Sequence, residues 1–507
     1  MAMFEYYLIF LIPLCIIILI FFKFENRRKG STPTNWPVVG MLPGLVGNAH
    51  RIHDYITEIL RENGATFVFK GPLFTNMDMV FTCDPININH IFNKRFSNYP
   101  KGPEFQKIFE IMGDGIFRSD FEMWELQRRL TLSIVNQVGF YTSVEKTTWG
   151  TVRTELVPVL DHFLQRGIEM EMQDILERFA FDNICHLLFN HNPCSLSTDF
   201  PHVRCEKALG DALEPLLHRH IWPESIWRLQ NWLNIGNEKK LTEASKAFDD
   251  FLHRCITSME DKDQTTNDVN IFGIFKKAYE ENSNKIRFAG DLRLFLRDGF
   301  LGLLIAGRDS LSTTLIWFFW LLSENPSAET KILEEIENVL SLSLHDDLRF
   351  FDVEECKKLV YLHACFYETL RLYPAVPLEL KSSILPDTLP NNIEVKKNTK
   401  IVLSFYSTGR MESVWGKDAL EFKPERWISD RGVLRNEPSF KFPAFNVGPR
   451  SCPGKEMALV EMKIVVVAIM HRYRVRVVEG HRVSPSDSVF LKTKHGLKVR
   501  LLSRKDA

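Results

Sequence analysis

The chain has 507 residues and a mass of 59.0 kDa, with 63 basic and 64 acidic residues and a formal net charge of −1. A hydrophobic fraction of 45% and a charged fraction of 25% are typical of a globular protein and exclude a disordered or collagen-like chain. The balance of charge also argues against a nucleic-acid-binding protein, which would need a large basic excess.

The first predicted element is an apolar segment at the N-terminus. No charged residue occurs from Tyr6 to Phe22, a length near the lower limit for a transmembrane helix. Lysines and arginines cluster at 23–29, which predicts that the chain beyond the segment lies in the cytosol. The segment lacks the basic n-region and the small-residue cleavage site of a signal peptide. We therefore interpret residues 1–22 as a retained membrane anchor rather than a cleaved signal peptide.

A linker is predicted at residues 23–44. It is basic at first and then rich in proline and glycine from Ser31 to Gly44. This composition predicts a stiff, non-helical spacer between the anchor and a cytosolic body. Residues 45–507 contain no internal repeat and no second proline-, glycine- or serine-rich boundary, so we expect them to form one large domain.

The body is predicted to be mainly helical, with small β-sheets near its two ends. Helical periodicity covers residues 144–190 and 241–260, while the polar residues 261–285 predict an exposed connection with one amphipathic turn. The predicted strands are Thr66–Phe69, Met79–Thr82, Val475–Val477, and a pair around His495 and Gly496 formed by Val489–Leu491 and Leu497–Leu501.

The segment from Gly299 to Leu322 is almost entirely apolar and long enough to span a membrane. Arg308 and Asp309 interrupt its middle, where charges would cost several kcal/mol in lipid. A buried helix through the centre of a globular core fits better. Two interpretations of the charged pair remain open. The pair forms a kink at which the polar groups are hydrogen-bonded, or it indicates that the helix passes an active site.

One of the nine cysteines lies in an unusual sequence. The cysteines are scattered and none forms a Cys-x-x-Cys pair, which excludes a disulfide framework and the common zinc-finger spacings. From Phe445 to Gly454, two glycines and two prolines restrict the backbone around Cys452, and a predicted helix follows. A thiolate at a helix N-terminus is stabilised, and it can be the axial ligand of a haem iron. Arg450 is placed to neutralise a haem propionate.

The string from Phe445 to Gly454 resembles the haem-binding loop of the cytochrome P-450 family, FxxGxRxCxG. Four further motifs agree in order and spacing, and the resemblance covers essentially the whole chain. It implies the mainly α-helical cytochrome P-450 fold with small β-sheets, after an N-terminal transmembrane helix. The further matches are WxxxR at 124–128, the oxygen-activating stretch at 306–310, ExxR at 368–371 and the meander motif at 422–427.

The resemblance implies a haem-thiolate monooxygenase that binds haem b, and it assigns roles to particular residues. Cys452 would ligate the iron, while Asp309 and Ser310 would relay protons during oxygen activation. The remaining roles are propionate binding by Trp124, Arg128 and Arg450, and a buried ionic lock of Glu368, Arg371 and Arg426 that serves the fold rather than catalysis.

Two positions depart from the family pattern. Ser310 stands where threonine is usual; it keeps the hydroxyl but lacks the methyl that restricts the rotamer. We therefore expect a less ordered proton delivery. Pro453 follows the cysteine and has no N–H to donate to the thiolate, which would alter the iron potential.

The resemblance also implies where a substrate would bind. The contacts are mostly apolar, which favours an apolar substrate. The same residues could equally be core packing, and composition alone does not separate the two. The implied contacts are Phe105, Phe109, Met112, Phe117, Ala306, Val376 and Leu378.

Within the family, the chain resembles the plant branch that hydroxylates long-chain fatty acids and alkanes, and most closely the midchain alkane hydroxylases. The stretches at 406–412, 415–416 and 306–309 and the linker at 35–43 carry this resemblance. Some members of the group instead couple phenols of alkaloids. The first hypothesis is therefore hydroxylation of a long-chain alkane or fatty acid, and the second is oxidation or phenol coupling of a plant specialised metabolite such as an alkaloid.

A third hypothesis is a haem-binding membrane protein without turnover, or an enzyme that rearranges peroxides. The Asp309–Ser310 pair and the normal spacing around Cys452 argue against it. Because the chain contains no flavin or nicotinamide domain, electrons from NADPH would come from a membrane-bound NADPH-cytochrome reductase. Arg128, Arg129 and Lys455 are candidates for its docking face. We expect a single-pass protein of the endoplasmic reticulum membrane with its catalytic domain in the cytosol.

Overall fold

The computed structural model describes residues 30–262, 270–283, 290–343 and 347–504. The anchor predicted at residues 1–22 and the start of the predicted linker lie outside the described residues. Within the described ranges, none of the helices has the length and apolar character needed to cross a membrane.

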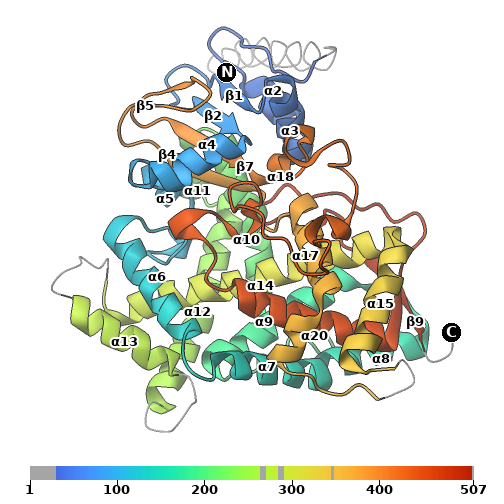
Figure 1. Ribbon diagram of the computed structural model, residues 1–507. Coiled ribbons are helices and arrows are strands. Elements are labelled where there is room, and N and C mark those ends of the chain that lie inside the picture. The colour runs from blue at the N-terminus through green and yellow to red at the C-terminus, as the bar shows by residue number, and fades with distance from the viewer. Residues whose placement is uncertain (1–29, 263–269, 284–289, 344–346, 505–507) are drawn as a thin grey trace, which may run out of the picture.

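The described chain is mainly helical with small sheets, which confirms the predicted fold class (Figure 1). The π-helical turn Val152–Leu156 joins α7 to α8. The helices are α2 (Leu42–Gly47), α3 (Ile52–Glu62), α4 (Pro85–Asn89), α5 (Gly102–Ile108), α6 (Phe121–Val135), α7 (Phe140–Thr151), α8 (Val157–Arg166), α9 (Met172–Phe189), α10 (Arg204–Ile221), α11 (Glu224–Leu233), α12 (Gly236–Lys262), α13 (Ile271–Asn282), α14 (Leu292–Glu324), α15 (Pro326–Leu340), α16 (Val353–Lys358), α17 (Val360–Leu372), α18 (Phe405–Thr408), α19 (Glu412–Trp415) and α20 (Lys455–Arg472).

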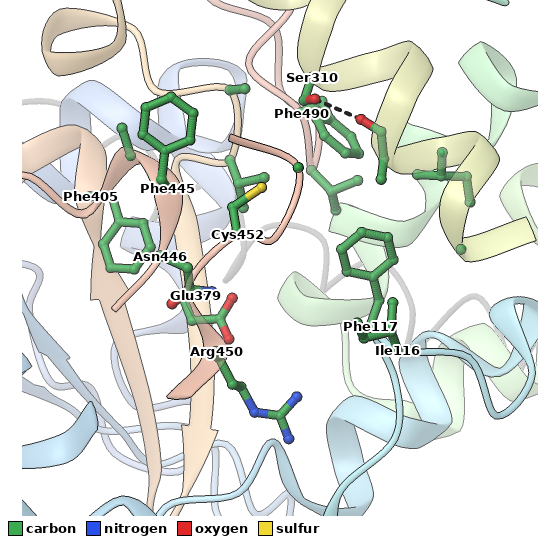
Figure 2. A pocket seen from close by; sticks show the side chains of 18 of the residues that line it. Ile116, Phe117, Ser310, Glu379, Phe405, Phe445, Asn446, Arg450, Cys452 and Phe490 are labelled. Atoms are coloured by element: carbon green, nitrogen blue, oxygen red, sulfur yellow. Dashed lines mark hydrogen bonds between the residues drawn. The ribbon is translucent and has the colours of Figure 1, made fainter. Parts of the chain in front are cut away.

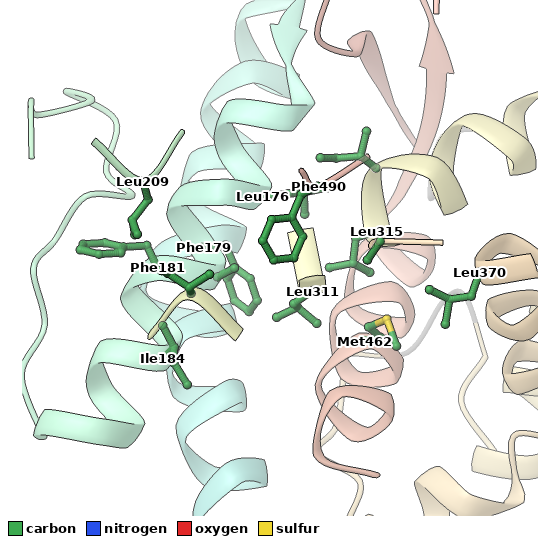
Figure 3. Close-up of a cluster of buried hydrophobic side chains, with 14 of the residues drawn as sticks. Leu176, Phe179, Phe181, Ile184, Leu209, Leu311, Leu315, Leu370, Met462 and Phe490 are labelled. Carbon is green, nitrogen blue, oxygen red and sulfur yellow. The ribbon is translucent and has the colours of Figure 1, made fainter. Parts of the chain in front are cut away.

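Helix α14 runs through the centre of the core, as predicted for Gly299–Leu322. Asp291 caps it by accepting a hydrogen bond from the Leu294 amide at 3.0 Å. Its apolar residues face α9 on one side and α17 and α20 on the other. Leu311 and Leu315 meet Phe179 of α9 in this cluster, and all three are buried (Figure 3). Packing against α9, α17 and α20 therefore holds α14 in place within the core.

The sheets lie at the edges of the helical body and pack against its core (Figure 1). The larger sheet has the order β1-β2-β7-β4, with β1 at Thr66–Phe69 and β2 at Met79–Thr82, both as predicted. Strands β2 and β7 are parallel, and the other pairs are antiparallel. The remaining strands are β4 (Leu378–Ser382), β7 (Lys400–Ser404), β3 (Met170–Glu171), β8 (Tyr473–Val477) and β9 (Lys498–Ser503) in a sheet of order β3-β9-β8, and β5 (Asp387–Thr388) paired with β6 (Glu394–Val395).

The predicted strand Val489–Leu491 is wrong. The backbone of Leu491 bonds elsewhere: its amide donates to the Ala375 carbonyl at 2.9 Å, and its carbonyl accepts from the Trp317 indole at 2.5 Å. Strand β9 therefore pairs with β8 and β3 and not across His495 and Gly496. A loop thus enters the interior where the sequence predicts a hairpin.

Two helix boundaries also differ from the prediction. The periodic region 144–190 is interrupted at Gly167, whose φ of 62° ends α8 before β3. Helix α2 begins inside the predicted non-helical linker, where Pro43 occupies the first turn and so removes no helical hydrogen bond. Helix α12 confirms the prediction for 241–260. The prediction of an exposed connection with one amphipathic turn at 261–285 is wrong for 271–282, because α13 has 12 residues and buries Ile271, Phe272 and Phe275 in the core.

Phe121 opens α6 in a left-handed backbone conformation, with φ of 51° and a side chain that is 61% exposed. Because this conformation costs a non-glycine residue about 1–2 kcal/mol, we expect Phe121→Gly to raise the free energy of unfolding by about 1 kcal/mol. Denaturant titration of the two proteins measures the difference. A lower free energy of unfolding in the variant would contradict this expectation. It would show that contacts of the Phe121 ring stabilise the protein by more than the left-handed backbone conformation destabilises it.

Candidate active site

A large apolar cavity lies inside the body, with a volume of about 410 Å³. Its wall is formed by α5, α6, α10, α14, β4, β7 and the loop before α20. Figure 2 shows Phe117, Ser310, Cys452 and Phe490 around this space. All the residues predicted to contact substrate lie on its wall: Phe105, Phe109, Met112, Phe117, Ala306, Val376 and Leu378.

The loop before α20 presents the Cys452 thiol to the cavity (Figure 2). The Cys452 amide donates to the Phe445 carbonyl at 2.7 Å, which fixes the turn. Gly448 has φ of 61°, and a Cβ there would lie 2.6 Å from the Phe92 carbonyl oxygen, so the turn requires glycine. Burial raises the pKa of the Cys452 thiol, and the Gly454 amide, Arg128 and Lys455 oppose that shift.

Arg450 and Trp124 form one side of the cavity beside this loop. The Arg450 guanidinium lies 4.6 Å from the centre of the Trp124 ring, and its Nη2 pairs with Asp120 at 2.7 Å. Its buried Nε has no hydrogen-bond partner in the described chain. Arg128 stabilises the Cys452 loop, because its Nη1 donates a hydrogen bond to the Ser451 carbonyl at 2.7 Å.

Positive charge is in excess in this part of the cavity. Glu379 lines the wall, with its Oε1 3.0 Å from Lys101 Nζ and 3.5 Å from Lys381 Nζ. Burial lowers the pKa of Lys381 to about 7. The cations are Lys101, Arg128, Lys381 and Arg450, and the carboxylates are Asp120 and Glu379.

Glu368 and Arg371 are fully buried and form a network with Arg426, whose side chain is 13% exposed. Glu368 accepts two hydrogen bonds from Arg371 at 2.8 Å each, one from Trp427 Nε1 at 2.8 Å and one from the Lys423 amide at 2.9 Å. Arg426 Nε lies 3.4 Å from the same carboxylate. The network joins α17 to the segment that follows α19 and does not line the cavity.

Ser310 reaches the cavity from α14. Its hydroxyl donates to the Ala306 carbonyl at 2.6 Å, one turn earlier in the helix (Figure 2). Ala306 and Gly307 line the same stretch of wall. The hydroxyl is therefore positioned to face a bound ligand.

Asp309 does not line the cavity, although the sequence pairs it with Ser310. Its Oδ1 accepts from Arg308 Nη1 at 2.6 Å and lies 3.2 Å from Lys492 Nζ. Arg308 also pairs with Glu177 at 2.8 Å and with Glu206 at 2.5 Å, which satisfies the charges buried in α14. The buried Oδ2 of Asp309 has no hydrogen-bond partner in the described chain.

Comparison with known proteins assigns the family. The profile of the Cytochrome P450 family matches residues 31–501. The chain belongs to the cytochrome P450 family. It is a cytochrome P450 monooxygenase, which excludes the hypothesis of a haem-binding protein without turnover.

This P450 is similar along almost its whole length to plant members of the family. Alkane hydroxylase MAH1 of Arabidopsis thaliana is 40% identical over 99% of this chain and 100% of its own. Noroxomaritidine synthase 1 of Narcissus pseudonarcissus is 39% identical over 95% of this chain and 93% of its own. Cytochrome P450 86B1 of Arabidopsis thaliana is 37% identical over 94% of this chain and 87% of its own.

The residues of this P450 fit the haem-thiolate cofactor that the family implies. Cys452 offers a thiol to the cavity, and the unpartnered Arg450 Nε and the excess cations suit two propionates. The indole N–H of Trp124 also makes no hydrogen bond to the described chain. When bound, the haem supplies the oxidising chemistry, and the protein supplies its ligand, its counter-charges and a dry, shaped space.

Sequence reasoning missed several residues of this P450 site. Lys101, Lys381 and Glu379 meet only because α5 packs on β4. His220 of α10 and Phe490 of the C-terminal loop also line the cavity. No local pattern marks them, since each belongs to an element whose contact with the cavity arises from tertiary packing.

Proposed function

We propose that this P450 hydroxylates a long-chain alkane or fatty acid, using haem b, O₂ and electrons that NADPH provides through a reductase. The observation that carries the proposal is the apolar cavity wall. Phenylalanines and aliphatic side chains dominate it, and the hydroxyls on it, those of Thr131, Ser310, Thr314 and Ser488, are bonded to backbone carbonyls. Such a wall favours an apolar chain over a polar metabolite. The similarity to an alkane hydroxylase supports the same substrate class.

Oxidation or phenol coupling of an alkaloid is the second candidate. The similarity to noroxomaritidine synthase 1 favours it, as does the stacked pair of Phe105 and Phe109, whose ring centroids are 4.3 Å apart on the cavity wall.

Microsomes that carry this chain and a plant reductase can separate the two candidates. NADPH and an equimolar mixture of long-chain alkanes, fatty acids and phenolic alkaloids are supplied, and products are identified by mass. A hydroxylated chain supports the proposal. An alkaloid product with no chain product would replace the proposal by the second candidate.

The proton relay is a proposed role for Ser310. Ser310→Ala removes the hydroxyl from the wall, so we expect product formed per NADPH consumed to fall about tenfold. Ser310→Thr keeps the hydroxyl and restricts its rotamer, and we expect it to retain or improve that ratio. Ser312→Ala is the matched control, because Ser312 bonds to the Arg308 carbonyl and does not line the cavity. Equal ratios in all four proteins would contradict the relay.

The proposed partners are a reductase and the endoplasmic reticulum membrane. Arg129 is 62% exposed and makes a long contact with the exposed Glu125, at 3.9 Å, whereas Arg128 faces the cavity. Charge reversal at Arg129 and Lys455 is expected to slow reduction by the reductase severalfold at low salt, with haem content unchanged. An unchanged rate would exclude this docking face.

Apolar side chains on α11 support membrane contact in addition to the anchor proposed at residues 1–22. Trp232 is 80% exposed, and Leu229 and Leu233 are exposed beside it. Exposed tryptophan and leucine on one short helix suit the interface of a lipid bilayer.

A further inference from the structure

His220 is a polar side chain on the cavity wall that the proposed chemistry does not use. It lies near the C-terminal end of α10, which ends at Ile221. The hydroxyls on the wall bond to backbone carbonyls. Lys101 pairs with Glu379 and Arg450 with Asp120, while Arg128 bonds to the Ser451 carbonyl and Glu461 to the Asn183 amide. His220 makes no hydrogen bond to any part of the chain that the structure describes. An unpaired imidazole in an apolar cavity is costly unless a ligand pairs with it.

The surroundings of His220 indicate which ligand group suits it. Its ring lies 5.6 Å from Phe109, Phe109 stacks on Phe105, and Lys101 Nζ lies 4.1 Å from the centre of the Phe105 ring. Burial and the positive charges of Lys400 and Lys101 lower the pKa of His220 to about 4. The imidazole is therefore neutral at physiological pH and offers one donor and one acceptor to a ligand. Lys101 and Lys400 are themselves paired with Glu379 and Glu104.

We propose that His220 binds the oxygen-bearing head group of a chain substrate and favours a fatty acid over an unsubstituted alkane. This inference rests on the proposed function and narrows its substrate class. A carboxylate accepts a hydrogen bond from the imidazole N–H, whereas an alkane leaves the imidazole unpaired. The buried Nε of Arg450, which also has no hydrogen-bond partner in the described chain, lies beside the Trp124 ring and the Cys452 loop and suits the haem.

Spectral titration of the haem-loaded protein tests the inference. The dissociation constants of dodecane, dodecan-1-ol and dodecanoic acid are measured from the ligand-induced absorption change, for the wild type and for His220→Leu. We expect the ratio of the alkane constant to the acid constant to fall about tenfold in the variant, because one hydrogen bond is lost. His220→Gln keeps a donor and an acceptor, and we expect it to retain most of the preference for the alcohol over the alkane.

His218→Leu is the matched control. His218 lies on the same helix, contacts Asn237 through Nδ1 at 2.6 Å and does not line the cavity. An unchanged ratio in His220→Leu, or the same fall in His218→Leu, would overturn the inference. A wild type that binds none of the three chains would instead refute the proposed function, and the inference that rests on it would fail with it.

Discussion

Replacing Cys452 with serine is expected to abolish monooxygenase turnover. The Cys452 thiol faces the cavity from a turn that the Phe445 carbonyl and Gly448 hold in place. Serine fits the same turn but offers a hydroxyl, which is not ionised at neutral pH and cannot replace a thiolate ligand that donates electron density to the iron. The turnover and the thiolate spectral signature should both disappear.

The measurement compares haem content, the spectrum of the reduced carbon monoxide complex and NADPH-dependent product. Cys194→Ser is the control, because Cys194 is an exposed cysteine outside the cavity. It should behave as the wild type in all three readouts. Wild-type turnover by Cys452→Ser, or loss of turnover by Cys194→Ser, would contradict the assignment of the ligand.

Replacing Glu368 with glutamine is expected to produce the largest loss of stability. The fully buried carboxylate holds Arg371, Arg426 and the Trp427 indole. Its loss leaves the buried Arg371 guanidinium without a counter-charge, whereas Arg426 keeps Asp418 at 3.1 Å. Breaking a buried ion pair in this way costs about 3–5 kcal/mol. A loss of that size is a large fraction of the stability of a typical domain, so we expect poor yield of the haem-loaded protein.

Denaturant titration of the protein that can be recovered gives the change in the free energy of unfolding. The matched control is Glu425→Gln in the neighbouring segment. Glu425 pairs with Lys331 at 2.6 Å, but both side chains are about half exposed, and such a pair contributes at most about 1 kcal/mol. If Glu368→Gln cost no more than Glu425→Gln, the network would be incidental to the fold.

Motifs with fixed local spacing were predictable from the sequence. Glu368 and Arg371 lie three residues apart in α17, a spacing that places them on one helix face. The Cys452 turn follows from its prolines and glycines. The strands β1 and β2 follow from their aromatic and β-branched residues, and Thr66 and Thr82 pair across them at 2.9 Å.

Features that depend on which way a side chain faces were not predictable. Ser310 lies one turn after Ala306 and shares its exposure to the cavity, whereas Asp309 is rotated by about 100° and faces Arg308 and Lys492. The same limit applies to His218 and His220, of which only the second reaches the cavity. The phase of a helix relative to a cavity is set by tertiary packing.

The predicted hairpin near the C-terminus shows a further limit. Residues 489–491 have the composition of a strand, but tertiary partners take the backbone groups of Leu491, and Phe490 faces the cavity. Long-range bonds from Trp317 and to Ala375 outweigh local strand preference.

Oxidation under oxygen-18 gas tests the central claim, that this P450 inserts oxygen into an apolar chain. The protein is reconstituted with reductase and NADPH, dodecanoic acid and dodecane are supplied separately, and products are analysed by mass. The account predicts a hydroxylated chain carrying one atom of oxygen-18, and none with Cys452→Ser. A phenolic substrate converted to a product two hydrogens lighter and free of label, with both chains returned unchanged, would contradict it.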